Sequence, residues 1–185
     1  MRMTTHNSFR VERIITPHEV NILKDNFNKL TPRLAHQDYN LFDVDKRLID
    51  DYSHPILRKI DRHVDLKPMS HYFVKYGEEG FTSLHTDDDG VVKLTVVTLI
   101  EDTDLVGGET LVIDRYMKSA RPKNKYAKRG KMVNAPIGQS KIPVIAKMKV
   151  GESVIYDNKV THGVCQVERG SRLVLVSWYM AHDEM

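Results

Sequence analysis

Three residues in this chain have the types and the spacing of a metal site. His85 and Asp87 are two positions apart, and a second histidine, His162, follows much later. On an extended strand, residues two apart project from the same face, so His85 and Asp87 can reach one ion. Two imidazoles and one carboxylate fill one face of a six-coordinate metal and leave the opposite positions open, which suits non-haem Fe(II). The three residues therefore predict an oxygen-activating iron site.

A fixed cation accompanies these candidate ligands. Arg172 lies ten residues after His162. Its planar guanidinium can hold a carboxylate through two parallel hydrogen bonds, so it suits the far end of a dicarboxylic acid. Because the chain has nine histidines, a His-x-Asp triplet can occur by chance and is weak evidence for a metal site by itself. Further motifs strengthen it: Tyr76 precedes His85 by nine residues, a Gly107–Thr110 Gly-Gly-Glu-Thr stretch follows, and Trp178 lies six residues after Arg172.

In this order and spacing, residues 68 to 181 resemble the 2-oxoglutarate- and Fe(II)-dependent dioxygenases, and within them the prolyl 4-hydroxylase-like branch. That branch has a tyrosine nine residues before the first ligand, a Gly-Gly-Glu-Thr strand, and a cation ten residues after the second histidine. The branch often has lysine where this chain has Arg172, but either cation neutralises a carboxylate. Asp88 and Asp89 are rival carboxylates, interpreted as solvated turn residues because the family ligand lies two residues after the histidine.

The resemblance implies roles for particular residues. It implies metal ligands at His85, Asp87 and His162, co-substrate contacts at Arg172, Tyr76 and Thr110, and an active-site wall at Trp178. The implied cofactors are Fe(II), 2-oxoglutarate and O2, with ascorbate as an optional reductant. The implied reaction hydroxylates an unactivated C–H bond and releases succinate and CO2. Without the spacing, Tyr76 and Thr110 would be read as ordinary core residues.

The substrate stays open at this level. A prolyl residue in a peptide or protein is favoured, and a free amino acid or another small molecule is an alternative. Oxidative demethylation of nucleic acid is a further alternative, although the second arginine usual in that family, six residues after the first, is here Trp178. A catalytically silent jelly-roll binding module is the least favoured reading, because all three ligands and the cation are present.

Composition is that of an ordinary globular protein. The chain has 185 residues, 29% charged and 41% hydrophobic, which fits one domain spanning 1–185. No apolar run approaches membrane-spanning length, and the first residues lack the apolar core of a signal peptide, so a cytoplasmic protein with no membrane partner is expected. The single cysteine, Cys165, agrees with a reducing compartment. The oligomeric state is left open.

Charge is distributed unevenly along the chain. Residues 115–149 hold 11 Lys and Arg and no Asp or Glu, whereas the remainder has 17 basic and 25 acidic residues. A basic loop is predicted at about 115–141, where proline and glycine interrupt the lysines. It is either a solvated insertion or an arm that attracts an acidic substrate. The candidate substrate contacts in it are Lys123, Lys125, Lys128 and Arg129.

The elements that must position these residues divide into two parts. A helical N-terminal part is expected over about 1–67: Thr16 and Glu19 form a capping box before a helix at 17–30, and a weaker helix at 47–61 is interrupted at Pro55. Seven strands are expected beyond Pro68, at 69–76, 94–100, 109–113, 142–149, 153–156, 163–168 and 172–179. The pattern predicts an α+β, mainly β fold, and the resemblance implies a double-stranded β-helix, or jelly roll, with the helices packed outside.

Overall fold

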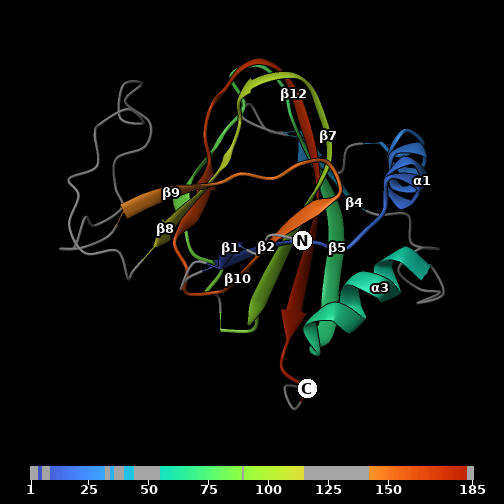
Figure 1. The fold of residues 1–185 in the computed structure, drawn as a ribbon, viewed down its shortest axis with the longest axis vertical. Helices are drawn as coiled ribbons and strands as arrows, with labels where there is room; N and C mark the ends of the chain where they lie inside the picture. Colours follow the sequence, from blue (N-terminus) through green and yellow to red (C-terminus); the bar gives the residue numbers. More distant parts are fainter. Residues whose placement is uncertain are drawn as a thin grey trace.

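Two antiparallel sheets form the body of the computed structural model, which describes residues 4–5, 9–31, 34–35, 40–43, 55–88, 90–114 and 142–182. The large sheet has the order β1-β2-β10-β7-β12-β5-β4-β3, and the small sheet has the order β6-β11-β8-β9 (Figure 1). The elements are β1 (Thr4–Thr5), β2 (Phe9–Arg13), α1 (Pro17–Phe27), β3 (Leu34–Ala35), β4 (Asn40–Asp43), α3 (Pro55–Val64), β5 (Lys67–Tyr76), β6 (Thr82–His85), β7 (Leu94–Gly107), β8 (Thr110–Asp114), β9 (Ile142–Ala146), β10 (Glu152–Asp157), β11 (His162–Val164) and β12 (Val167–Met180). This is the predicted jelly roll.

Helix α1 begins where the sequence predicted. The Thr16 hydroxyl accepts from the Glu19 backbone N–H, the Glu19 carboxylate accepts from the Thr16 N–H, and Pro17 stands in the first turn. The helix ends at Phe27, about one turn before the predicted end at Leu30, because the Leu30 N–H bonds to the Phe27 carbonyl in a tighter turn.

Helix α3 starts at Pro55, the residue at which the sequence predicted an interruption. Proline has no N–H to donate and a helical φ, so it is well tolerated in the first turn. The helix continues to Val64, three residues beyond the predicted end. Residues 47–54 of the predicted helix lie outside the described part of the chain.

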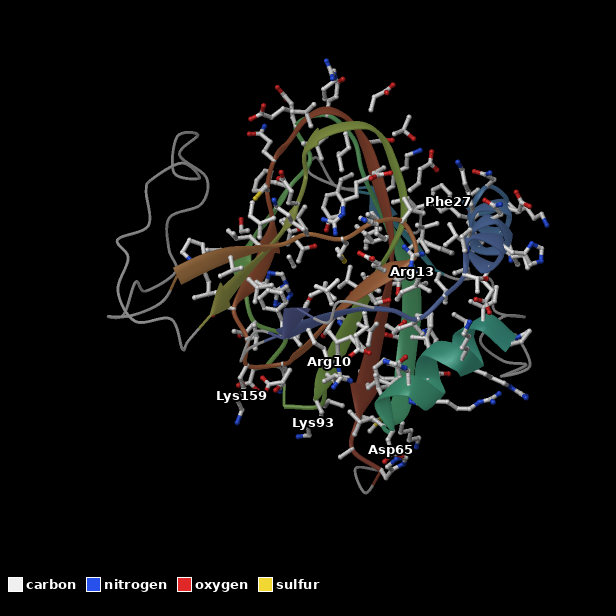
Figure 2. All side chains as sticks on the ribbon, viewed as in Figure 1. Arg10, Arg13, Phe27, Asp65, Lys93 and Lys159 are labelled. Carbon is white, nitrogen blue, oxygen red and sulfur yellow. The ribbon has the colours of Figure 1, made fainter. Side chains whose placement is uncertain are left out.

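Both helices lie against the outer face of the large sheet (Figure 1). Strand periodicity separates the two cores: Phe73 and Leu175 belong to the helix-side cluster, whereas Val74 and Val176 belong to the cluster with residues of the small sheet. Phe27 lies on the sheet-facing side of α1 (Figure 2), and its ring meets that of Phe73 edge-on at 5.5 Å. The expectation that the helices pack outside the sheet is confirmed.

The N-terminal part is less helical than the sequence predicted. Strands β1 to β4 add to the two edges of the large sheet, with β2 pairing with β10 and β4 with β5. The predicted strand at 163–168 is divided between β11 and the start of β12. Within the described residues, no helix is long and apolar enough to cross a membrane. The predicted basic loop at 115–141, with its four candidate contacts, lies outside the described residues.

Candidate active site

The three candidate metal ligands meet at one end of the small sheet. His85 ends β6 and His162 begins β11, and the two residues are direct partners in the antiparallel pairing of these strands. Asp87 lies two residues after the end of β6 and is not itself part of a strand. One ligand atom from each of the three residues nevertheless lies within 4.8 Å of the other two.

Backbone carbonyls fix the orientation of both imidazoles. The Nδ1 atom of His85 is 2.8 Å from the Ser83 carbonyl oxygen, and the Nδ1 atom of His162 is 3.0 Å from the Val160 carbonyl oxygen. A carbonyl only accepts, so each Nδ1 carries the hydrogen and each Nε2 keeps a free lone pair. Metal-binding histidines commonly have this outer hydrogen bond, so the donor set fits a metal ion.

The carboxylate of Asp87 is held between the two imidazoles. Its oxygens lie 3.6 Å from Nε2 of His85 and 3.7 Å from Nε2 of His162. The Thr95 hydroxyl donates a 2.6 Å hydrogen bond to Oδ2 from strand β7 of the large sheet. Thr95 thus fixes the carboxylate from the opposite wall of the sandwich.

Burial makes the two histidines electrostatically different. The pKa of His162 is lowered to about 4, chiefly by burial and also by the neighbouring His85, whereas Asp87 opposes the shift. The pKa of His85 is raised, chiefly by its interaction with Asp87. Both lie at similar distances from Asp87, but the His85 side chain is 44% exposed and that of His162 only 8%. Desolvation therefore decides the direction for His162, and the carboxylate decides it for His85.

Arg172 lies on β12, opposite Tyr76 in the pairing with β5. Its side chain donates to the Gly108 carbonyl and to the Thr110 hydroxyl, each at 2.6 Å, and the residue is only 2% exposed. Burial lowers the pKa of Arg172. No carboxylate in the described part of the chain forms an ion pair with it. A buried cation without an anionic partner is costly, so this position suits a bound anion.

A cavity of about 300 Å³ connects the two groups between the sheets. Its walls include His85, Asp87 and His162 at one place and Tyr76, Thr110 and Arg172 at another. Apolar side chains from both sheets complete much of the lining: Val74, Val97, Val164, Val174 and Val176. The Tyr76 hydroxyl lies 2.9 Å from the Thr82 hydroxyl.

Aromatic residues form a further wall. Trp178, the expected wall residue, lines the cavity together with Tyr72, and their rings meet edge-on at 5.2 Å. Sequence reasoning missed Tyr72, Thr95 and Tyr156 as lining residues. Strand alternation predicts which residues of one strand share a face of the sheet. It does not predict that this face of the large sheet lies opposite the histidines of the small sheet.

The rival carboxylate Asp88 does not line the cavity. Asp88 is exposed and accepts a hydrogen bond from the Asn158 side chain at 3.1 Å. Asp89 lies outside the described residues. The predicted ligand Asp87 is thus the carboxylate that the fold brings to the two histidines.

Residues 9–183 match the model of a family described as "oxygenase, catalysing oxidative methylation of damaged DNA". The chain belongs to this family. No curated protein matches the sequence. Membership in the narrower prolyl 4-hydroxylase-like branch stays a prediction.

Solved structures share the fold at low identity. A 2OG-Fe(II) oxygenase family oxidoreductase from Burkholderia pseudomallei has a TM-score of 0.66 and 14% identity, covering 96% of this chain and 86% of its own. HygX from Streptomyces hygroscopicus, with nickel, 2-oxoglutarate and hygromycin B bound, has a TM-score of 0.65 and 10% identity. The match covers 95% of this chain and 84% of HygX. A Pseudomonas putida prolyl-4-hydroxylase has a TM-score of 0.57 and 16% identity, and the match covers 96% of this chain and 94% of the hydroxylase. These likenesses concern the fold alone.

Proposed function

We propose that this protein is an Fe(II)- and 2-oxoglutarate-dependent oxygenase in which His85, Asp87 and His162 bind the iron. The observation that carries the proposal is the arrangement of three ligand atoms within 4.8 Å, with both imidazole Nδ1 atoms already engaged by backbone carbonyls. Three ligands on one face leave room for a co-substrate and O2, as this chemistry requires.

The same proposal assigns the far carboxylate of 2-oxoglutarate to Arg172, supported by Thr110 and Tyr76. Arg172 is buried and donates one hydrogen bond each to Gly108 and Thr110, so further N–H groups of its guanidinium are available to a carboxylate. Thr110 holds the guanidinium in place from the small sheet. Tyr76 lines the same part of the cavity.

When bound, iron and 2-oxoglutarate supply the oxidising chemistry, with O2 consumed and succinate and CO2 released. The protein contributes position and exclusion of water. The valines from both sheets make the cavity between the metal ligands and Arg172 largely apolar, which strengthens the interaction of Arg172 with an anion. Asp87 keeps one orientation because Thr95 donates to it.

For the substrate, we infer an alkylated base in a nucleic acid. Family membership supports this inference, since the family description concerns damaged DNA. The basic stretch at 115–149 can attract phosphates, and the aromatic faces of Tyr72 and Trp178 can stack on a base. Oxidation of an N-methyl group by O2, coupled to conversion of 2-oxoglutarate to succinate and CO2, gives an N-hydroxymethyl group that releases formaldehyde and restores the base.

A prolyl residue in a peptide or protein is the second candidate. It is favoured by the spacing of Tyr76, His85 and the Gly107–Thr110 stretch, which is that of the prolyl 4-hydroxylase-like branch. Hydroxylation of proline would use the same iron and co-substrate. Free amino acids and other small molecules would use the same centre as well.

Anaerobic titration with Fe(II) and then 2-oxoglutarate tests the proposed centre. We expect a weak visible charge-transfer band, and we expect His85→Ala, Asp87→Ala or His162→Ala to abolish it. If all three variants keep the band and full succinate production, the assigned ligands are wrong.

Oxygen is then admitted with methylated single-stranded DNA or with a prolyl peptide, with and without ascorbate. Mass spectrometry follows loss of the alkyl group from the base or gain of one oxygen in the peptide. Dealkylated DNA with untouched peptide supports the first candidate, whereas the reverse result replaces it with the second. Faster turnover with ascorbate would support its expected role as a reductant.

A further inference from the structure

The cavity contains a buried polar residue to which neither the metal centre nor the carboxylate anchor gives a role. Tyr156 lies on β10 and lines the cavity, although the residue is only 3% exposed. Its ring packs on that of His162, with the centroids 4.3 Å apart and the planes tilted by 38°. The residue therefore stands directly beside a proposed metal ligand.

The Tyr156 hydroxyl makes no hydrogen bond to any residue in the described part of the chain. Among the described residues, the fully enclosed side-chain oxygen without a partner is Ser70 Oγ, so the Tyr156 oxygen is instead accessible from the cavity that the residue lines. A polar group at a cavity wall is normally satisfied by water or by a ligand. By contrast, the buried Tyr179 hydroxyl donates to Asp61 at 2.9 Å. The open hydrogen bond of Tyr156 points to something that enters the cavity.

The neighbours of the phenol indicate what its hydroxyl can meet. Tyr156 packs on His162 and lines the cavity together with Asp87 and Arg172. A phenol is an O–H donor, so the incoming group that it meets should be a hydrogen-bond acceptor.

We propose that the Tyr156 hydroxyl donates a hydrogen bond to the metal-side end of bound 2-oxoglutarate, its keto acid group. This assignment rests on the proposed function. Arg172 would hold the far carboxylate while Tyr156, which packs on His162, positions the end that meets the iron. Tyr156 would then be a co-substrate-binding residue contributed by the large sheet.

Tyr156→Phe is the direct test, because phenylalanine keeps the ring against His162 and removes only the hydroxyl. We expect the affinity for 2-oxoglutarate, measured anaerobically with Fe(II) bound, to fall roughly tenfold or more, as for a lost hydrogen bond to a charged group. The affinity for Fe(II) itself should stay within about twofold of wild type. The visible band should also shift, because a hydrogen bond to the chelating group is lost.

Glutarate locates the contact, because it has both carboxylates of 2-oxoglutarate but no keto group. Tyr156→Phe should weaken 2-oxoglutarate much more than glutarate, whereas Arg172→Ala should weaken both. Tyr179→Phe is the matched control: it removes a buried hydroxyl from the helix-side core and should leave both affinities unchanged. Equal weakening of both ligands in Tyr156→Phe would contradict a contact with the keto acid end.

The outcomes separate this inference from the proposed function. If wild-type protein binds neither Fe(II) nor 2-oxoglutarate, the proposed function fails and the inference fails with it. If wild type binds both, and Tyr156→Phe binds 2-oxoglutarate as tightly, only the Tyr156 assignment is overturned; this includes a result in which only the KM for the primary substrate changes. Should the variant not fold, the ultraviolet difference spectrum of wild type on adding 2-oxoglutarate decides, because a phenol that donates to an anion shifts its absorption and an unchanged tyrosine spectrum contradicts the contact.

Discussion

Arg172 combines two properties at the residue scale that are rarely found together: a full positive charge and near-complete burial. Its guanidinium donates to a carbonyl and to a hydroxyl, neither of which neutralises the charge. The fold therefore carries the cost of an uncompensated cation, and binding of a dicarboxylate would relieve it. We therefore expect this single side chain to contribute much of the affinity for a dicarboxylate co-substrate.

For Arg172→Ala we expect the affinity for 2-oxoglutarate to fall by a factor of roughly ten to more than a hundred, corresponding to about 1.5–3 kcal/mol for a charge-assisted contact. Tyr76→Phe should have a milder effect. Isothermal titration in the absence of oxygen measures both. Arg169→Ala, an exposed arginine on the same strand, is the control. Unchanged affinity in Arg172→Ala would exclude this anchor, and weakened iron binding alone would indicate a structural role.

At the scale of elements, the metal centre depends on the close approach of β6 and β11. Gly163 follows His162 on β11, and a Cβ atom built there would lie 2.7 Å from the Thr82 carbonyl oxygen on β6. That atom is backbone and cannot rotate away. The two strands must therefore separate to accept any side chain at Gly163, and His85 must then move relative to His162.

Gly163→Ala should accordingly lower both the free energy of unfolding, by about 1–3 kcal/mol as for overpacking, and the affinity for Fe(II). Thermal unfolding with and without metal measures the two effects. Gly77→Ala is the matched control, since nothing lies within 4 Å of a Cβ at Gly77. If Gly163→Ala and Gly77→Ala have the same melting temperature and metal affinity, the close strand contact is not limiting.

A second inter-element contact links α3 to the large sheet through a buried histidine. Nε2 of His71 lies 3.4 Å from an Asp61 carboxylate oxygen, and Nδ1 lies 2.8 Å from the Ser177 hydroxyl. The Tyr179 hydroxyl donates to the same carboxylate oxygen. Burial lowers the pKa of His71 to about 4, so the folded protein holds it neutral. Burial raises the pKa of Asp61. The folded protein therefore binds a proton at Asp61 more readily than the unfolded chain does, and this stabilises the fold as the pH falls, opposite to the effect of His71.

The sign of the resulting pH dependence follows from proton binding. Between about pH 6.5 and 4 the unfolded chain binds a proton at His71 that the folded protein does not, so stability is highest above this window and falls as the pH falls through it. From pH 7 to 5 we expect a loss on the order of 2 kcal/mol from this group. Denaturant unfolding should show a flatter pH profile for His71→Gln than for wild type. His18→Gln, at an exposed position on α1, should keep the wild-type slope; equal slopes in all three proteins would contradict this origin.

At the scale of the whole molecule, charge is segregated along the sequence. A strongly basic segment interrupts a chain that is otherwise acidic, with 17 basic and 25 acidic residues outside 115–149. Such an asymmetry favours an acidic macromolecule over a small neutral substrate. The proposed iron and co-substrate contacts lie outside this segment, so binding of the macromolecule should be separable from the chemistry.

Neutralising four residues of the segment together should leave Fe(II) and 2-oxoglutarate binding intact and raise the KM for alkylated single-stranded DNA. The residues are Lys123, Lys125, Lys128 and Arg129. The difference from wild type should shrink with increasing salt, because exposed charges are then screened. Neutralising Arg58 and Arg62, exposed on α3, is the control. If the KM for DNA does not change, or changes equally at all salt concentrations, the segment does not attract DNA through its charge.

Much of the candidate site could be predicted from residue types and their spacing. His85, Asp87, His162 and Arg172 were found because their types and their distances along the chain follow a pattern that does not depend on knowing the fold. The cap at Thr16 was found because a capping box is local, formed by residues three apart. Strand alternation was also readable, because its period belongs to the backbone.

Which segments face one another could not be predicted from the sequence and follows from the folded structure. Strands β1 to β4 exist because they pair with β2, β10, β5 and each other, and short segments carry little signal of such pairing. Thr95 and Tyr156 reach the site from the large sheet, across the cavity from β6 and β11. Their spacing from the ligands along the chain has no fixed relation to distance in space. Contacts between the two sheets are set by how the whole sandwich closes, and that closure is the sum of many weak packing interactions distributed over the chain.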